Sequence, residues 1–254
     1  IKEIISMSEN KAVALTEDSL LEDAASGLEN VGVDDIAIPF IKVAQALSPE
    51  LKKHDEMKYI EGLQEGDFFN SLDGTPYNGK KGITVVPVAY RRTYLEWRPN
   101  RGGLESVHNS SEILSEATKG DRGQLFLENG NQISPTGNHY VYILEENGGY
   151  TPAQLSLAGS QLKKSRKWNA MMAGIKIRSS KGEVFTPATY SHKYHMQTAI
   201  ETYDGNSWFG VDFTLVGRLG TEETRLYQEA RNFARHVNSE NVTAALPDDQ
   251  SDPF

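Results

Sequence analysis

Residues 83–99 read ITVVPVAYRRTYLEWRP, a run dominated by β-branched and aromatic side chains. Such residues favour extended backbone, and their alternation predicts a long β-strand. Pro87 has no N–H to donate to a neighbouring strand, so it predicts a bulge or an edge position. A strand of this length needs hydrogen-bonded partners, which constrains the chain to a mainly β fold.

Partner strands are predicted along the rest of the chain. Asn129-Gly130 lies between two short apolar runs and predicts a hairpin within residues 123–133. A short strand and a turn are expected within 36–51, and tight turns around a Phe68-Phe69 strand within 61–82. Alternating patterns predict further strands at residues 138–146, 190–203 and 207–219.

Two segments have helical patterns. Residues 151–174 are predicted to form one helix, with Thr151 as N-cap, Pro152 in the first turn and Gly174 at the end. Residues 221–237 are predicted to form the other, because Leu226, Ala230, Phe233 and Val237 make an apolar stripe at helical spacing.

These elements predict a mainly β protein with two helices. Six to eight strands with an inserted helix are typical of an OB-fold-like barrel, and a β-sandwich with peripheral helices is the alternative. We expect one OB-like domain over residues 31–237. Acidic segments are expected to flank it: a disordered one at 1–30 and a flexible tail at 238–254.

Composition narrows the class of protein. The chain has no cysteine, which excludes disulfides and thiolate metal sites. No apolar run reaches the roughly 18 residues of a membrane helix, and no signal-peptide pattern is visible. We therefore expect a cytoplasmic protein, in the host cytoplasm if it is viral. Because Met7 opens a stretch typical of a natural start, residues 1–6 are expected to be upstream sequence.

Charge is distributed unevenly, although the net charge of −9 argues at first against nucleic acid. Residues 1–79 carry 6 basic and 16 acidic side chains, residues 80–194 carry 16 and 9, and residues 195–254 carry 4 and 10. The middle of the chain is therefore at +7 between two acidic flanks. A local basic surface indicates nucleic-acid binding, with chance clustering of surface charge as the alternative.

The strand at 83–99 carries the first candidate site. Period-2 alternation places Tyr90, Arg92, Tyr94 and Glu96 on one face. Single-stranded nucleic acid is bound in this way, because aromatic rings stack on bases while cations hold phosphates. Alternatively, the tyrosines pack at the edge of the core. The predicted stacking strand comprises Tyr90, Arg91, Arg92, Tyr94, Trp97 and Arg98.

The predicted helix at 151–174 carries the second candidate, the sequence KKSRKW. Cations this close on a helix repel one another, and a phosphate backbone would relieve that repulsion and release counterions. An ordinary solvated face is the alternative. The predicted backbone-holding residues are Lys163, Lys164, Arg166, Lys167 and Trp168.

A third candidate is YSHKYHMQ, in which Lys193 and Tyr194 are predicted to contact DNA, with a plain strand as the alternative. His192 and His195 are three residues apart, which on a strand directs them to opposite faces, so no metal site is predicted. Phosphate-binding glycine loops and nucleophile-elbow motifs are missing. We therefore expect no enzymatic activity and no cofactor.

The chain ends LPDDQSDPF, which combines acidic residues with a terminal aromatic. This ending resembles the acidic C-terminal tip of bacterial single-stranded DNA-binding proteins, although Gln250 and Ser251 interrupt the acidic run. The residues that match the tip are Asp248, Asp249, Asp252, Pro253 and Phe254.

Residues 36–215 are similar to phage-encoded single-stranded DNA-binding proteins, notably in IPFIKVAQALSPEL, EGDFFNSLDGTPYNGKKGITVVPVAYRRTYLEW and QLKKSRKWNAMM. The resemblance implies an OB-fold, coating of single-stranded DNA in viral replication or recombination, and a tail that recruits replication proteins. Two alternatives stay open: a structural or assembly protein of a virus particle, and a nuclease or recombination enzyme that acts on DNA.

Overall fold

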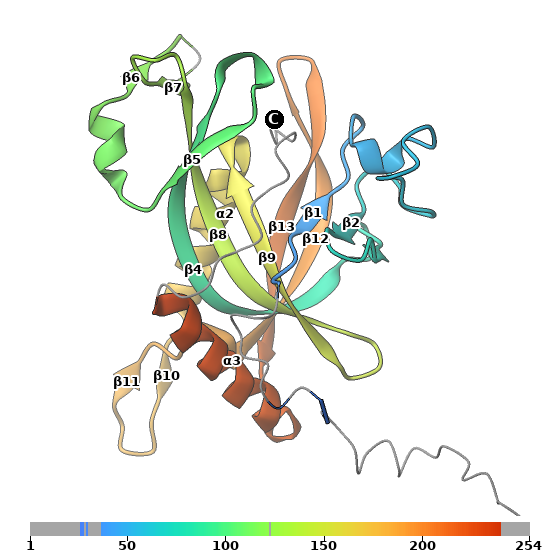
Figure 1. The fold of residues 1–254 in the computed structure, drawn as a ribbon. Coiled ribbons are helices and arrows are strands. Elements are labelled where there is room, and N and C mark those ends of the chain that lie inside the picture. The colour runs from blue at the N-terminus through green and yellow to red at the C-terminus, as the bar shows by residue number, and fades with distance from the viewer. Residues whose placement is uncertain (1–25, 28, 30–36, 122, 240–254) are drawn as a thin grey trace, which may run out of the picture. The chain divides into compact units, whose positions relative to one another are not determined.

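A computed structural model describes residues 26–27, 29, 37–121 and 123–239 of the chain. The chain divides into two units, residues 1–36 and 37–254, and every described strand and helix belongs to the second. The centre of this second unit is a curled, eight-stranded antiparallel sheet that closes half of a barrel (Figure 1).

The strands of this sheet run in the order β13-β12-β4-β8-β7-β6, with β5 paired to β4 and β9 paired to β8. Its eight strands are β4 (Ile83–Trp97), β5 (Leu104–His108), β6 (Thr118–Lys119), β7 (Leu125–Phe126), β8 (Gln132–Leu144), β9 (Tyr150–Ala158), β12 (His192–Tyr203) and β13 (Asn206–Arg218).

Two smaller sheets and two helices complete the described fold. One small sheet contains β1 (Ile41–Val43), β2 (Phe68–Asn70) and β3 (Pro76–Tyr77). The other is a hairpin of β10 (Ile177–Arg178) and β11 (Val184–Phe185). The helices are α2 (Leu162–Gly174) and α3 (Thr224–Asn238).

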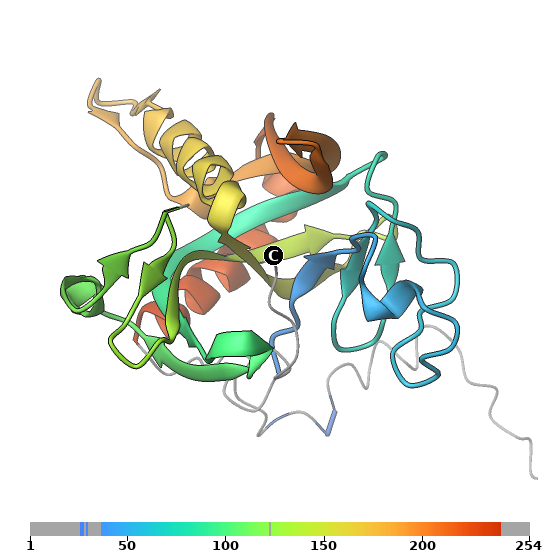
Figure 2. The same cartoon turned by 90° about the horizontal axis from the view of Figure 1, so that it is seen from above.

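The two helices lie on opposite faces of the main sheet. His139 and Tyr140 are neighbours in β8, so their side chains point to opposite faces. The His139 ring lies 4.6 Å from the Trp168 ring of α2, and the Tyr140 ring lies 6.1 Å from Phe233 of α3. Figure 2 shows this arrangement from above, with the sheet between the helices.

Each helix covers its own core. On the α2 side, Trp168 is fully buried and stacks on Phe213 of β13 at 3.9 Å between ring centroids. Around this pair are packed Ile83, Val85, Val141, Ile143, Leu155, Leu157, Tyr194 and Met196. On the α3 side, a smaller core contains Ile38, Val88, Tyr140, Ala230, Phe233, Ala234 and Val237.

The prediction of a single helix over 151–174 is wrong in its first half. Residues Tyr150–Ala158 form β9, which pairs with β8 along its whole length. Leu155 and Leu157 are buried at strand spacing, so pairing and core packing override the capping signal of Thr151-Pro152. The helix begins at Leu162 and ends at Gly174, the predicted end.

Other local predictions are confirmed. The pairing of β4 with β8 shifts register between Pro87 and Ala89, which is the bulge expected from Pro87. Asn129-Gly130 lies in the turn between β7 and β8. The predicted C-terminal helix is α3, which buries Leu226 and Phe233 on the predicted stripe.

Two strand predictions need correction. The strand expected at 138–146 begins earlier, because β8 starts at Gln132 and passes through Pro135 and Gly137. The stretch expected to be a loop around a short helix, 100–123, also contains β5, which pairs with the end of β4. The β10–β11 hairpin had no sequence-based prediction.

The predicted fold class is confirmed: the chain is mainly β with two helices, and the curled sheet is OB-like. The helix inserted between strands is α2. The predicted acidic end segments fall largely outside the described residues. In the part of the chain that is described, no helix is long and apolar enough to cross a membrane.

Candidate nucleic-acid interface

The start of α2 is held by the β12–β13 hairpin. The Gln161 side chain accepts a hydrogen bond from the Val211 backbone N–H at 2.9 Å and donates one to Glu201 at 3.1 Å. Gly210 makes this approach possible, because a Cβ atom there would lie 2.7 Å from Gln161 Nε2. The β12–β13 hairpin therefore fixes one end of the helix.

The opposite support of α2 comes from β8. His139 Nε2 lies 2.8 Å from the Ser165 hydroxyl, in a buried contact. Gly137 leaves room for Ser165, because an added Cβ atom would lie 2.6 Å from its Oγ atom. Burial lowers the pKa of His139 to about 3. The His139 imidazole, which lies beneath the helix, is therefore neutral at physiological pH.

The outward side of α2 is cationic. Lys163, Arg166 and Lys167 are exposed, and within the described residues no ion pair engages them. Their inward neighbours Ser165 and Trp168 are buried. The helix therefore presents three positive side chains to solvent from a rigid, well-packed base.

Lys164 belongs to a different environment. Its ammonium group lies 2.9 Å from Glu201 and 2.7 Å from Asp212, and its side chain is 20% exposed. Burial opposes the charged form, but the bonds to the two acids outweigh it and hold the pKa of Lys164 above its ordinary value. Lys164 therefore joins α2 to β12–β13 and is not available to a phosphate in this arrangement.

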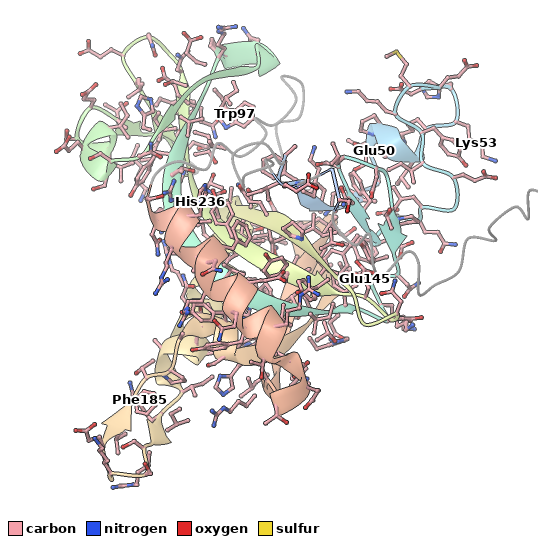
Figure 3. The ribbon with its side chains drawn as sticks, turned by 60° about the horizontal axis from the view of Figure 1, so that its bottom comes forward. Glu50, Lys53, Trp97, Glu145, Phe185 and His236 are labelled. Carbon is pink, nitrogen blue, oxygen red and sulfur yellow. The ribbon has the colours of Figure 1, made fainter. Side chains whose placement is uncertain are left out.

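Further cations lie on and beside the β10–β11 hairpin, in the stretch of sequence that follows the helix. From Leu162 to Gly182 the sequence holds seven Lys or Arg residues and no Asp or Glu. The side chains of Lys176, Arg178 and Lys181 are exposed. Figure 3 shows the hairpin standing away from the sheet, with Phe185 on it.

The prediction from KKSRKW missed these hairpin residues. The long interval without an acidic residue, rather than the short cluster, is the signal that could have found them. We define the cationic face as Lys163, Arg166, Lys167, Lys176, Arg178 and Lys181.

The predicted stacking strand is only partly accessible. Alternation holds along β4 after the bulge, since Tyr90 pairs with His139 and Arg92 with Gly137 in one continuous register. Tyr90 is half-buried, and its ring lies 4.9 Å from the His139 ring. Arg91 is half-buried too, and Arg92 lies 5.8 Å from the centre of the Tyr94 ring.

Four predicted contact aromatics are packed inside the protein. Exposed fractions are 6% for Tyr94, 8% for Trp97, 0% for Trp168 and 1% for Tyr194. A ring must offer a face to stack on a base, so these residues fall outside the interface in this conformation. Trp168 follows a run of cations in the sequence, but its position on α2 turns it into the core.

Two further predicted cations, besides Lys164, are already paired with acidic residues. The Lys193 ammonium group lies 2.8 Å from Glu223, just before α3, with both side chains mostly buried. Arg98 is exposed and forms an ion pair with Glu105. In the described part of the chain, no cluster of three or more His, Asp or Glu side chains is arranged to hold a metal ion.

Comparison with known proteins gives one match. The model of the family described as Pam3 phage gp34-like protein matches residues 8–243. The chain belongs to the Pam3 phage gp34-like family. No curated protein and no solved structure matches it.

Membership in the gp34-like family confirms the phage part of the resemblance. Single-stranded DNA binding stays a prediction for this gp34-like chain. Its C-terminal tip, Asp248, Asp249, Asp252, Pro253 and Phe254, lies outside the described residues.

Proposed function

We propose that this gp34-like family member binds single-stranded DNA without sequence preference and coats it during viral DNA replication or recombination. The observation that carries the proposal is the cationic face. Its six side chains are exposed on α2 and the β10–β11 hairpin, within a stretch that contains no acidic residue before Glu183.

Electrostatic attraction supplies most of the affinity in this proposal. Each phosphate neutralised by a Lys or Arg side chain releases condensed counterions, so affinity falls steeply as salt rises. The helix needs no rearrangement, because Trp168 and Ser165 already fix its orientation. Arg92 and Tyr90, on the sheet face that carries α2, would extend the contact toward β4.

Aromatic side chains would add contacts with bases. Phe185, which pairs with Ile177 across the β10–β11 hairpin, is 45% exposed and offers a ring on the same hairpin as Arg178. Stacking is tolerant of sequence because every base has a flat face, and a single strand presents those faces freely. A duplex hides them, so we expect weaker binding to double-stranded DNA.

The acidic tip has a second role in the proposal. Asp248, Asp249 and Asp252 would occupy the cationic face when DNA is absent, and phosphates would displace them. Phe254 would then be free to bind a replication or recombination protein. Deleting residues 246–254 is expected to tighten DNA binding, most at low salt, and to abolish partner recruitment. Unchanged affinity would contradict this masking.

We propose further that binding is the whole activity and that no catalytic step follows. Incubation of labelled DNA with the protein and Mg²⁺ or Mn²⁺ tests this directly. Intact DNA is the expected result, whereas metal-dependent cleavage would establish the nuclease alternative.

Fluorescence anisotropy across a salt series tests the main proposal. Labelled oligo(dT) is expected to bind tightly at low salt and to weaken along a linear log–log plot. A duplex of equal length serves as the control for general charge attraction. Absence of oligo(dT) binding at low salt, or equal affinity for both DNAs, would overturn the proposal.

A further inference from the structure

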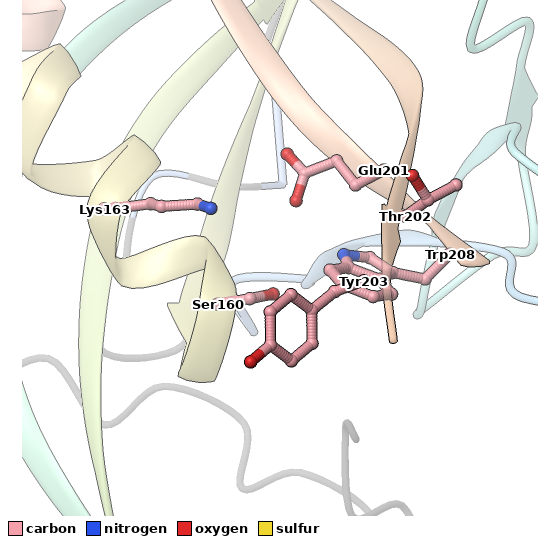
Figure 4. A pocket seen from close by; sticks show the side chains of 6 residues that line it. All are labelled: Ser160, Lys163, Glu201, Thr202, Tyr203 and Trp208. Atoms are coloured by element: carbon pink, nitrogen blue, oxygen red, sulfur yellow. The ribbon is translucent and has the colours of Figure 1, made fainter. Parts of the chain in front are cut away.

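A hollow lies beside the start of α2, outside the sites predicted from sequence. Ser160 and Lys163 line one side, and Glu201, Thr202, Tyr203 and Trp208 of the β12–β13 hairpin line the other (Figure 4). Its volume is about 420 Å³. This is within the range of roughly 300–1,000 Å³ typical of small-ligand sites.

Two aromatic rings dominate the hairpin side of the hollow. Glu201 pairs with Trp208 across the hairpin, so their side chains share a face, and Tyr203 lies two residues further on the same face. Tyr203 is 77% exposed. An exposed tyrosine beside a half-buried tryptophan provides flat apolar surface that the fold itself leaves uncovered.

A hydrogen-bond donor in the hollow lacks an acceptor. The indole nitrogen of Trp208 is buried, and no described atom accepts a hydrogen bond from it. Figure 4 shows this nitrogen on the side of the ring that faces α2. A buried N–H without an acceptor costs free energy, and the carbonyl oxygen of a base would satisfy it after a shift of the side chains that cover the nitrogen.

The charges around the hollow favour a phosphate. Glu201 is the acidic group in the wall, and its carboxylate is engaged by Lys164 and Gln161. Lys163 on the opposite side is exposed and has no ion pair within the described residues. Lys163 and Lys167 are one helical turn apart, so the hollow is continuous with the cationic face.

We propose that the hollow is a base-binding subsite. One base of a DNA single strand stacks on Tyr203 and Trp208, and the adjoining phosphate contacts Lys163. This inference rests on the proposed function and specifies where the protein binds a base of the strand. The cationic face holds the strand by its backbone on either side of that base.

The first test compares a normal strand with one that lacks bases. Y203A is expected to lose about 5- to 150-fold in affinity for oligo(dT), the range expected for one stacked base. For an abasic strand of equal length, Y203A and the wild type are expected to bind alike. Y203F keeps the ring and is expected to bind oligo(dT) almost as the wild type does.

The second test uses tryptophan emission. Trp97 and Trp168 are 8% and 0% exposed, so Trp208 is the tryptophan that bound DNA would contact. Oligo(dT) is expected to quench emission of the wild type, and W208F is expected to lose that quenching. Circular dichroism confirms that each variant is folded.

Three results would overturn the subsite. Two are equal losses of Y203A on both strands and full quenching in W208F. Wild-type affinity of Y203A for oligo(dT) would overturn it too. In each case the wild type still binds oligo(dT), so the proposed function stands. If the wild type binds neither strand, the proposed function fails and the subsite fails with it.

Discussion

The helices α2 and α3 lie on opposite faces of one sheet, but they differ in which side chains they bury and in how their charges are arranged. The α3 helix buries five residues, among them Phe233 and Val237, and its Arg225 is paired with Glu229 one turn away. The α2 helix buries Ser165, Trp168 and Met172 and leaves three cations without acidic partners in the described structure. A regular apolar stripe therefore marks the stabilising helix, and three exposed cations within five residues mark the candidate binding helix.

The largest effect on stability is expected from a substitution in the core beneath α3. Phe233→Ala removes a ring that packs on Tyr140 and Tyr142, which is expected to lower the free energy of unfolding by about 3–5 kcal/mol. Urea denaturation measures the change. The exposed Asn232→Ala is the matched control and is expected to stay within about 0.5 kcal/mol. The DNA affinity of the folded Phe233→Ala protein should be unchanged. A loss of DNA affinity would contradict the assignment of α3 to stability alone.

A pH series addresses the α2 side. The unfolded chain protonates His139 below about pH 6.5, whereas burial lowers the pKa of this side chain to about 3 in the folded protein. The free energy of unfolding is therefore expected to fall as pH drops from 6.5 toward 3, by about 2–3 kcal/mol at pH 4.5 from this residue alone. His139→Phe keeps a ring at this position and removes the titration, so its stability should depend less on pH. Equal pH slopes for the two proteins would rule out this role of His139.

Charge removal on the two helices separates their functions. Lys163, Arg166 and Lys167 changed together to Gln are expected to weaken oligo(dT) binding by about 10- to 100-fold at low salt. The slope of log affinity against log salt should fall in magnitude by about 2, because three phosphate contacts are lost. The matched control changes Arg225, Arg231 and Arg235 of α3 to Gln, with the same change in net charge. If both triple variants bind equally weakly, net charge rather than α2 explains the affinity.

The smallest effect is expected at Lys193, which the sequence predicted to contact DNA. Lys193→Met breaks the pair with Glu223 and is expected to cost about 1 kcal/mol in unfolding free energy. Oligo(dT) affinity should stay the same. A loss of affinity at unchanged stability would indicate that Lys193 contacts DNA.

The accuracy of sequence-based prediction differs between these helices for a physical reason. The apolar stripe of α3 fits only the helical periodicity, so the approximate bounds of the helix follow from the sequence. Residues 151–158 fit two structures. Leu155 and Leu157 have the spacing of a strand, whereas Thr151 and Pro152 are typical of the start of a helix. The choice is made by pairing with β8, which no local pattern contains.

The candidate site shows the same limit. The exposure of Lys163, Arg166 and Lys167 agrees with the predicted basic helix face, since solvated cations need only a helix. The burial of Trp168 and the pairing of Lys164 depend on Phe213 and Asp212, which come much later in the chain. Tyr203 and Trp208 carried no motif and are brought to α2 by tertiary folding.

The support of α2 has a consequence for the timing of synthesis. Phe213 and Val211, which hold the helix, are translated after the whole cationic face. Until β13 has left the ribosome, α2 has its support from β8 but lacks the contacts with Val211 and Phe213. The candidate binding surface is therefore completed only after β13 has been made, later than the cationic residues themselves.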